Sequence, residues 1–399
     1  MAQFQWPRIA GFVAGFILAT AVTYIPPATA QELAARKPAT AQQMAEYHRK
    51  LVAYKAVHDK FEAQASTYWT AISDKRRARN AKRRNKEAIG AEDYVLTQPP
   101  VYSGPPRPVD PSEPEKPPRH RKPIPVVADF LQHAAEQFQF VPRRPRNETE
   151  FKVAYARVAS AAGLTREQAV RVYSFEAGGN GGYNVQAGLE RPRPNARAIS
   201  TALGYNQLLT TNTVELLAEQ GHGILKALES AASRMQGQQR SAMEHKIAIV
   251  RKMVAFCKSV PDQWSAHEKL GVTPKGIGVH ALNLDVDVGP WLQTHKLLTS
   301  VEFAQRKGYT KPLSAAELEM MNLTGDGTGF DMVSMPQALR EIVPTSNFFQ
   351  RTGYERNPVA IRNNTVAKLL AATDTRMDRE STLPGARDMT AAFSDLSRR

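Results

Sequence analysis

The sequence predicts a mainly α-helical protein of 399 residues. Three observations support this: apolar side chains recur three and four positions apart, helix-start residues precede several such stretches, and strand-like alternation is scarce. We expect helices over residues 40–90, 126–139, 148–162, 165–176, 212–229, 239–258 and 314–322. A short helix is expected near 364–372, followed by a loose chain end.

The first 30 residues have the pattern of a secretory signal peptide. Arg8 precedes an apolar run over residues 9–25, two prolines end the run, and Ala28-Thr29-Ala30 supplies the small residues of a cleavage site. The competing interpretation is an uncleaved membrane anchor, for which the run is only marginally long enough. We therefore expect a periplasmic or secreted protein with no transmembrane span after cleavage.

Charge and cysteine content restrict the class of protein. The formal net charge is +15, which in an exported protein indicates attraction to wall polymers or anionic lipid and not to nucleic acid. A basic protein that binds nucleic acid or membrane is the alternative that rests on charge alone. Cys257 is the only cysteine and has apolar neighbours, so we interpret it as a core residue. No spacing typical of a metal site or a nucleotide-binding loop occurs, and we expect no cofactor.

The region before residue 126 divides into two parts. Residues 31–97 form a basic amphipathic helical region with an apolar stripe, made of Met44, Tyr47, Leu51, Tyr54, Phe61, Tyr68 and Ile72. This stripe fits a helix packed on its own domain or a coiled coil, so residues 40–90 could also contact an envelope protein partner. The basic cluster over residues 75–86 is either a solvated face or an attachment to an anionic polymer. Residues 98–125 contain eleven prolines and predict a semi-rigid linker.

Residues 126–343 are predicted to form one helical domain, and residues 344–399 a partly disordered C-terminal extension. Within this domain, Thr165 and Gln168 have the spacing of a capping box, so a helix begins at Thr165. Gly178 and Gly179 end it. Glu176 therefore lies in its last turn, where the helix dipole and nearby apolar groups favour the protonated carboxyl. Such an acid is what cleavage of a glycosidic bond requires.

The segments around Glu176 resemble motifs of the lytic transglycosylase family, a branch of the lysozyme-like superfamily. The stretch from Ser174 to Gly179 is similar to its catalytic-glutamate motif, and residues 198–209 are similar to its Ser-x-x-Gly-Ala-x-Gly-Leu-Met-Gln motif. Residues 281–289 are similar to its Asn-Ile-x-x-Gly segment, which opens a helix. Residues 319–327 are similar to its Ala-Tyr-Asn-x-Gly segment, with Met321 in place of the tyrosine. The four stretches cover about half of the chain and keep the family's order.

The resemblance implies a lysozyme-like domain that cleaves the MurNAc-GlcNAc bond of peptidoglycan and forms a 1,6-anhydro end. It implies Glu176 as the catalytic acid and base. The candidates for binding the sugar are polar or aromatic: Gln207, Ser200, Asn206, Tyr205, Tyr183 and Asn322. Because Tyr205 and Asn206 replace the family's Leu-Met and Ala177 replaces its serine, the alternative is a non-catalytic peptidoglycan-binding or envelope assembly protein with the same fold.

These motifs contain one candidate catalytic carboxylate, that of Glu176. Hydrolases of glycosidic bonds normally use two carboxylates that flank the bond, whereas a lytic transglycosylase uses the substrate's own C6 hydroxyl as the nucleophile. A single credible glutamate therefore favours transglycosylation. The interpretation would change if Asp285, Asp287 or Asp326 approached Glu176 in space.

Overall fold

The computed structural model describes residues 39–113, 123–189 and 195–396, and it is mainly α-helical, as predicted. Two compact units make up the chain: Pro123–Ser334 with residues 370–396, and residues 39–113 with Met335–Leu369. Within the described residues, β-structure is limited to isolated bridges. The predicted signal peptide lies outside the described residues. In the part that is described, no helix combines the length and apolar character needed to cross a bilayer.

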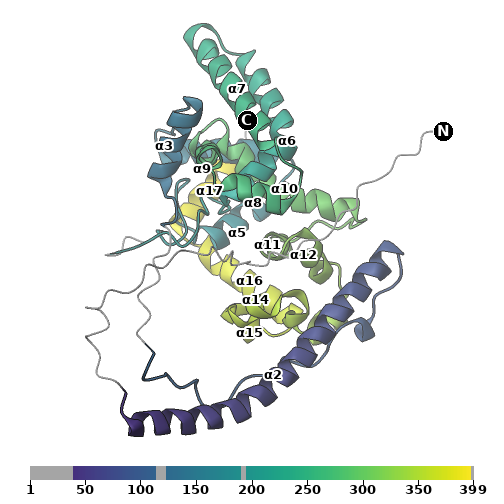
Figure 1. Cartoon of the computed structure of the whole chain (residues 1–399). Helices are drawn as coiled ribbons and strands as arrows, with labels where there is room; N and C mark the ends of the chain where they lie inside the picture. Colours follow the sequence, from purple (N-terminus) through teal and green to yellow (C-terminus); the bar gives the residue numbers. More distant parts are fainter. Residues whose placement is uncertain (1–38, 114–122, 190–194, 397–399) are drawn as a thin grey trace, which may run out of the picture. The chain divides into compact units, whose positions relative to one another are not determined.

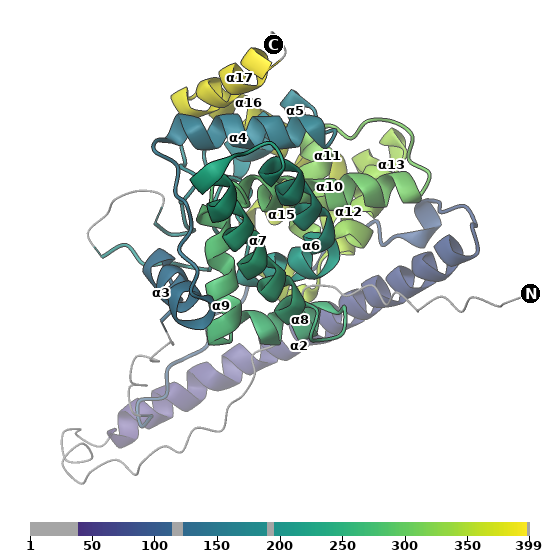
Figure 2. The ribbon, with the colours of Figure 1, turned by 90° about the horizontal axis from the view of Figure 1, so that it is seen from above.

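In the first unit α6 and α7 lie side by side, as Figures 1 and 2 show. Its helices are α3 (Val127–Phe138), α4 (Glu148–Ala161), α5 (Arg166–Glu176), α6 (Thr210–Ala232), α7 (Gly237–Cys257), α8 (Trp264–Gly271), α9 (Pro274–His280), η2 (Ala281–Leu284), α10 (Gly289–Arg306), α11 (Ala315–Thr324), α12 (Asp326–Val333) and α17 (Pro384–Leu396). α6 packs against α7, α8, α9 and α10. A Cβ on Gly221 of α6 would lie 2.6 Å from a methyl carbon of Val254, so glycine permits the close approach of α7. Cys257 is fully buried in this core.

The start of α6 differs from the prediction. The sequence predicted a helix that begins at residue 212, whereas α6 begins at Thr210. The Asn212 side chain instead accepts a hydrogen bond from the main-chain N–H of Leu209 at 3.2 Å. It therefore reaches back over the first turn, and the helix starts two residues before Asn212.

The predicted loose chain end after residue 372 is wrong. α16 (Val366–Ser381) extends well beyond it and α17 follows, so residues 370–396 belong to the first unit. α17 packs against α4 and α5, and Figure 2 shows it beside both. Met389, Ala392 and Phe393 are buried at spacings of three and four residues. This short apolar stripe folds because α4 and α5 provide the surface that covers it.

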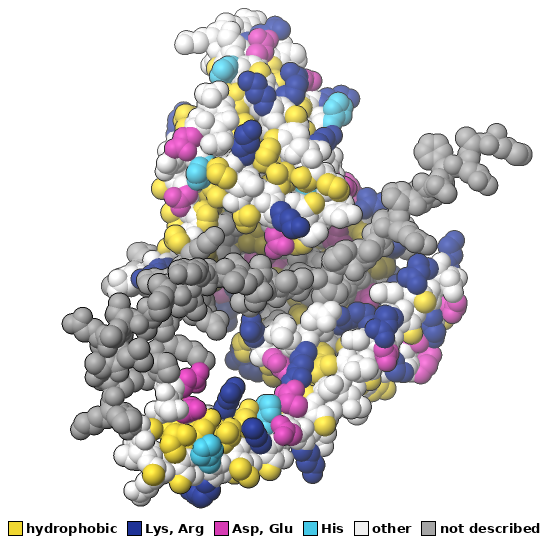
Figure 3. All heavy atoms as spheres, in the orientation of Figure 1, with side chains coloured by type: hydrophobic (Ala, Val, Ile, Leu, Met, Phe, Trp, Pro, Cys, Tyr) yellow, Lys and Arg dark blue, Asp and Glu magenta, His cyan; other side chains and the backbone are white. Residues whose placement is uncertain are grey.

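The second unit consists of α2 (Ala41–Arg84) and short helices from two distant parts of the chain. The short helices are η1 (Ala91–Asp93), α13 (Gln337–Ile342), η3 (Thr345–Phe348), α14 (Arg351–Glu355) and α15 (Pro358–Arg362). The C-terminal half of the α2 stripe is covered by its own unit: Ile72 and Ala65, which lies on the same face, are buried, and the Tyr68 hydroxyl lies 2.7 Å from the Ser346 hydroxyl. This favours a helix packed on its own domain. Figure 3 shows hydrophobic side chains gathered along the N-terminal half of α2.

The described part of the proline-rich segment, residues 98–113, returns along α2. The ring of Tyr102 contacts Tyr54 and Phe61, with centroids 6.2 and 5.3 Å apart. The Tyr102 side chain thus attaches this segment to the apolar stripe of α2. Its prolines alone would leave the segment extended. This part of the predicted linker therefore lies along the helix, and residues 114–122 fall outside the described residues.

The basic cluster at the end of α2 is partly internal. The Arg79 side chain is fully buried, lies 4.4 Å from the ring centroid of Tyr94, and donates to the carbonyl oxygen of Asp93 at 2.8 Å. Lys82 pairs with the Asp93 carboxylate at 2.8 Å. Arg79 and Lys82 therefore hold the unit together, so the cluster is not a wholly solvated face. Attachment of its exposed cations to an anionic polymer stays a prediction.

Candidate active site

Helix α5 carries Glu176 as its last residue. The predicted capping box is present, because the Thr165 side chain accepts from the Gln168 N–H and the Gln168 side chain accepts from the Thr165 N–H, both at 3.1 Å. Gln168 also donates to the Leu313 carbonyl at 2.9 Å, which ties the helix start to the chain just before α11. Gly178 and Gly179 have φ angles of +61° and +67° and turn the chain after the helix. The position of Glu176 is thus determined from both ends of α5.

Glu176 meets two polar residues of α11. The Asn322 side chain donates to Oε1 of Glu176 at 2.9 Å and lies 3.5 Å from Oε2 of Glu319. The carboxyl group of Glu319 is close to that of Glu176, because each carboxyl shifts the pKa of the other. Glu319 and Asn322 share a face of α11 because they are three residues apart. The structure therefore brings the predicted residues Glu176 and Asn322 together and adds a second carboxyl.

Burial determines the protonation of this pair. Desolvation raises the pKa of Glu176, although the charges of Lys296 and Arg376 and the hydrogen bonds oppose the shift. Glu319 is fully buried, and desolvation together with the charge of Glu176 raises its pKa well above the ordinary value. Two adjacent carboxyls in such surroundings do not both ionise readily. The Glu176–Glu319 pair thus holds a proton more firmly than an exposed carboxyl would.

The C-terminal part of the chain clamps the loop that follows Glu176. The Arg376 guanidinium lies 4.2 Å from the ring centroid of Phe175 and donates to the Phe175 carbonyl at 2.9 Å. The Ala386 N–H donates to the Gly179 carbonyl at 2.8 Å. A Cβ on Gly179 would lie 2.1 Å from the Glu380 carbonyl oxygen. The segment predicted to be loose is therefore what supports the last turn of α5.

Three of the predicted sugar-binding side chains are buried in the core. Tyr205 is fully buried, and its hydroxyl donates to Glu148. The ring of Tyr183 is stacked on Phe151 at 5.0 Å between centroids. Asn206 is fully buried, and its amide donates to the Gln293 carbonyl at 2.7 Å. Their aromatic and amide groups are used internally, so these residues are not available to a sugar.

Gln207 and Ser200 are half-buried on the segment before α6. Gln207 has a left-handed backbone with φ of +45°, and its side chain donates to the Gly204 carbonyl at 2.8 Å. The Ser200 hydroxyl accepts from the Ala202 N–H at 3.2 Å. Both side chains stabilise the turn that isolated bridges close around Leu203. Their predicted contact with sugar stays a prediction.

The aspartates considered as second carboxylates lie in other networks. Asp285 and Asp287 both pair with Lys246, at 2.8 and 2.5 Å. Asp326 accepts from the Ser300 hydroxyl at 2.5 Å. The carboxyl beside Glu176 is Glu319, which the motif comparison passed over. Its spacing of three residues from Asn322 was the available signal.

No cluster of three or more metal-ligating side chains occurs within the described residues. The chain matches no model of a known protein family, no curated protein and no solved structure. The chemistry of this site therefore has to be argued from its own residues.

Proposed function

We propose that the chain is a peptidoglycan lytic transglycosylase that cleaves the MurNAc-GlcNAc bond with Glu176 as acid and base, in a lysozyme-like domain. One observation carries the proposal: Glu176 ends a capped helix and has a raised pKa beside Asn322 and Glu319. A carboxyl with a raised pKa stays protonated to higher pH than an ordinary one and can protonate the oxygen of a leaving sugar. The resemblance of the four motifs supports the choice of substrate.

The reaction needs only one proton on the pair. Glu176 donates it to the glycosidic oxygen as the bond to the anomeric carbon breaks. The C6 hydroxyl oxygen of the same sugar then bonds to that carbon, and its proton passes to the Glu176 carboxylate. The products are a free hydroxyl on one fragment and a 1,6-anhydro ring on the other, and the enzyme regains its proton. Glu319 acts as a positioning residue that shares the proton with Glu176.

The arrangement of the two carboxyls around Asn322 argues against an ordinary hydrolase. Retaining enzymes hold their two carboxyl groups about 5–5.5 Å apart and inverting enzymes about 6.5–9.5 Å apart, on either side of the bond. One amide nitrogen, that of Asn322, contacts both carboxyls, so Glu176 and Glu319 lie together and do not flank a sugar's bond from opposite sides. The pair therefore works as one acid and base, which fits internal attack by the substrate.

The test is mass spectrometry of soluble products after purified peptidoglycan sacculi are incubated with the full chain. The variants are Glu176→Gln and, as a matched control, Glu167→Gln, which changes an exposed glutamate at the other end of the same helix. Anhydro-muropeptides from wild type and the control, but not from Glu176→Gln, are expected. Far-UV circular dichroism checks that all three proteins fold.

Other outcomes would contradict parts of the proposal. Products with reducing ends would mean hydrolysis and a second carboxylate elsewhere. Binding to sacculi without any product would favour the non-catalytic wall-binding or assembly protein. Activity retained by Glu176→Gln would remove Glu176 from the mechanism.

A further inference from the structure

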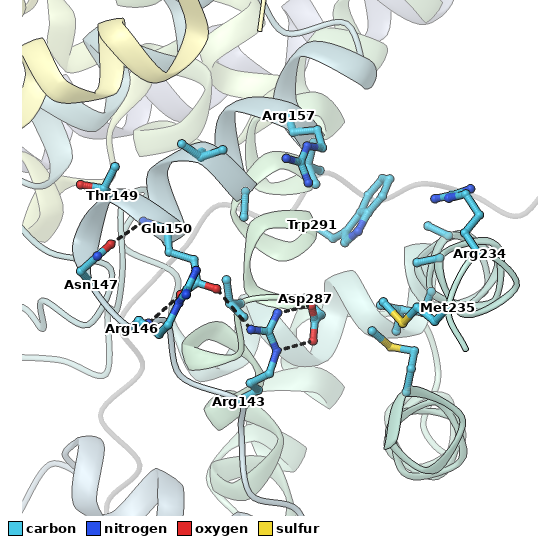
Figure 4. A pocket seen from close by; sticks show the side chains of 18 residues that line it. Arg143, Arg146, Asn147, Thr149, Glu150, Arg157, Arg234, Met235, Asp287 and Trp291 are labelled. Atoms are coloured by element: carbon cyan, nitrogen blue, oxygen red, sulfur yellow. Dashed lines mark hydrogen bonds and ion pairs between the residues drawn. The ribbon is translucent and has the colours of Figure 1, made fainter. Parts of the chain in front are cut away.

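A second feature of the first unit is a cleft of about 730 Å³ between α4, the end of α6, α7 and the start of α10. This volume is typical of small-molecule sites. Figure 4 shows its lining, with four arginines around an apolar floor. None of the residues that line it belongs to the Glu176 site. We call this feature the cationic cleft.

The arginines of the cationic cleft fall into two groups. Arg143 pairs with Asp287 at 2.7 Å and Arg146 pairs with Glu150 at 3.2 Å, so these charges are already compensated. Arg157 and Arg234 are exposed, and among the described residues neither has a carboxylate partner.

Among the described residues, the side chain of Arg234 bonds only to the Ser230 hydroxyl, at 3.0 Å, so most of its donors point to no described partner. In Figure 4, Trp291 lies between Arg157 and Arg234. Two uncompensated guanidinium groups beside an aromatic ring attract an anion, and their planar donors match the oxygens of a carboxylate or a phosphate.

The floor of the cationic cleft is apolar and adaptable. It includes Val153, Val158, Leu228, Met235 and Met243. Methionine side chains adjust to apolar ligands of varied shape. A neighbouring hollow of about 640 Å³ shares Met235 and Met243 with this floor, so the apolar surface continues beyond the arginines. An occupant can therefore extend along it.

The walls favour an acyl chain over a peptide. Most of the lining residues lie on helices, whose main-chain groups are mostly bonded within the helix, so an extended peptide would find few partners for its own main chain along these walls. An acyl chain has no such groups and needs only apolar contact. We therefore propose that the cationic cleft binds a single-chain anionic amphiphile, with its carboxylate or phosphate at Arg157 and Arg234 and its chain over Met235 and Met243.

The test is isothermal titration of the full chain with three probes of equal chain length below their micelle concentrations. The probes are dodecanoate, dodecyl phosphate and the uncharged dodecyl maltoside. At least one anion should bind at one site and about tenfold or more tighter than the maltoside, because a charge-assisted hydrogen bond contributes that much. The better anion identifies the headgroup. Equal affinities for all three would overturn the proposal.

Variants locate the binding. Replacing both Arg157 and Arg234 with Gln should weaken binding of the anion by about a hundredfold, since each loses a charged contact. The control Arg387→Gln, an exposed arginine on α17, should change nothing. Ala154 also lines the cleft, so Ala154→Leu should narrow it and weaken the binding of all three probes. Unchanged binding by the double variant or by Ala154→Leu, with the fold intact by circular dichroism, would place the amphiphile elsewhere and refute the proposal.

Discussion

Asn322→Ala is the substitution that examines the proposed acid most directly. It removes the 2.9 Å hydrogen bond to Glu176 and the longer contact to Glu319. A hydrogen bond to a charged group contributes about 1.5–3 kcal/mol, so if the carboxylate develops in the transition state, kcat should fall about 10- to 150-fold. The loss should appear mainly in kcat, because the bond orients the acid and not the sugar.

The same change predicts a pH effect with a definite sign. The Asn322 hydrogen bond lowers the pKa of both carboxyls, so its loss raises the pKa of Glu176 and Glu319 further. Glu176 then stays protonated to higher pH, and the alkaline limb of the pH–rate profile should move to higher pH. The assay is the initial rate of fragment release from sacculi, measured across pH.

The matched control is Asn363→Ala, which removes a 2.9 Å hydrogen bond of a half-buried asparagine in the second unit. It should leave kcat and the pH profile unchanged. If Asn322→Ala keeps the wild-type kcat, or if its alkaline limb moves to lower pH, Asn322 does not act on the acid in the way proposed.

Three further predictions concern the pair and the fold. Glu319→Gln should move the alkaline limb of the pH–rate profile to lower pH, because the last proton of the pair is then held by one carboxylate instead of two. If the limb does not move, Glu176 and Glu319 do not share a proton. Phe393→Ala should lower the free energy of unfolding by about 3–5 kcal/mol, because it removes a buried ring of α17 and leaves a cavity. The control Asp395→Ala changes an exposed residue and should leave this free energy unchanged. Urea unfolding measures both variants, and a loss below about 1 kcal/mol in Phe393→Ala would contradict the packing of α17. Burial lowers the pKa of His280 from 6.5 to about 4. Between these two pH values the imidazole is protonated in the unfolded chain but not in the folded chain. The folded protein therefore loses stability as pH falls through this range. That loss should amount to about 3 kcal/mol between pH 7 and pH 4 in urea unfolding, and an equally steep loss in His280→Gln would refute it.

The sequence was sufficient for features that depend on near neighbours. The capping box of Thr165 and Gln168 and the stop at Gly178 placed Glu176 at the end of a helix, and the structure has α5 there. The long α2 was predicted from its apolar stripe, although it ends at Arg84 and not at residue 90. Such signals are local because a cap or a turn satisfies main-chain groups within a few residues.

Features that depend on distant parts of the chain were missed. Tyr205 and Asn206 were candidates for binding sugar, but their contacts with Glu148 and Gln293 lie more than fifty positions away. α17 was missed because its short stripe gains stability only when α4 and α5 cover it. In both cases burial, and not residue type, decides what the side chain does.

The sequence by itself therefore determined the helical class and the end of α5 that carries Glu176, because helix periodicity and capping are encoded within one or two turns. The tertiary structure alone decided that Glu319 and Asn322 of α11 reach Glu176, and that the C-terminal segment supports it. Glu176 and Glu319 are 143 positions apart, and the shift in their pKa values arises from burial that neither helix provides alone. Proximity and desolvation are properties of the packed chain, which no local pattern records.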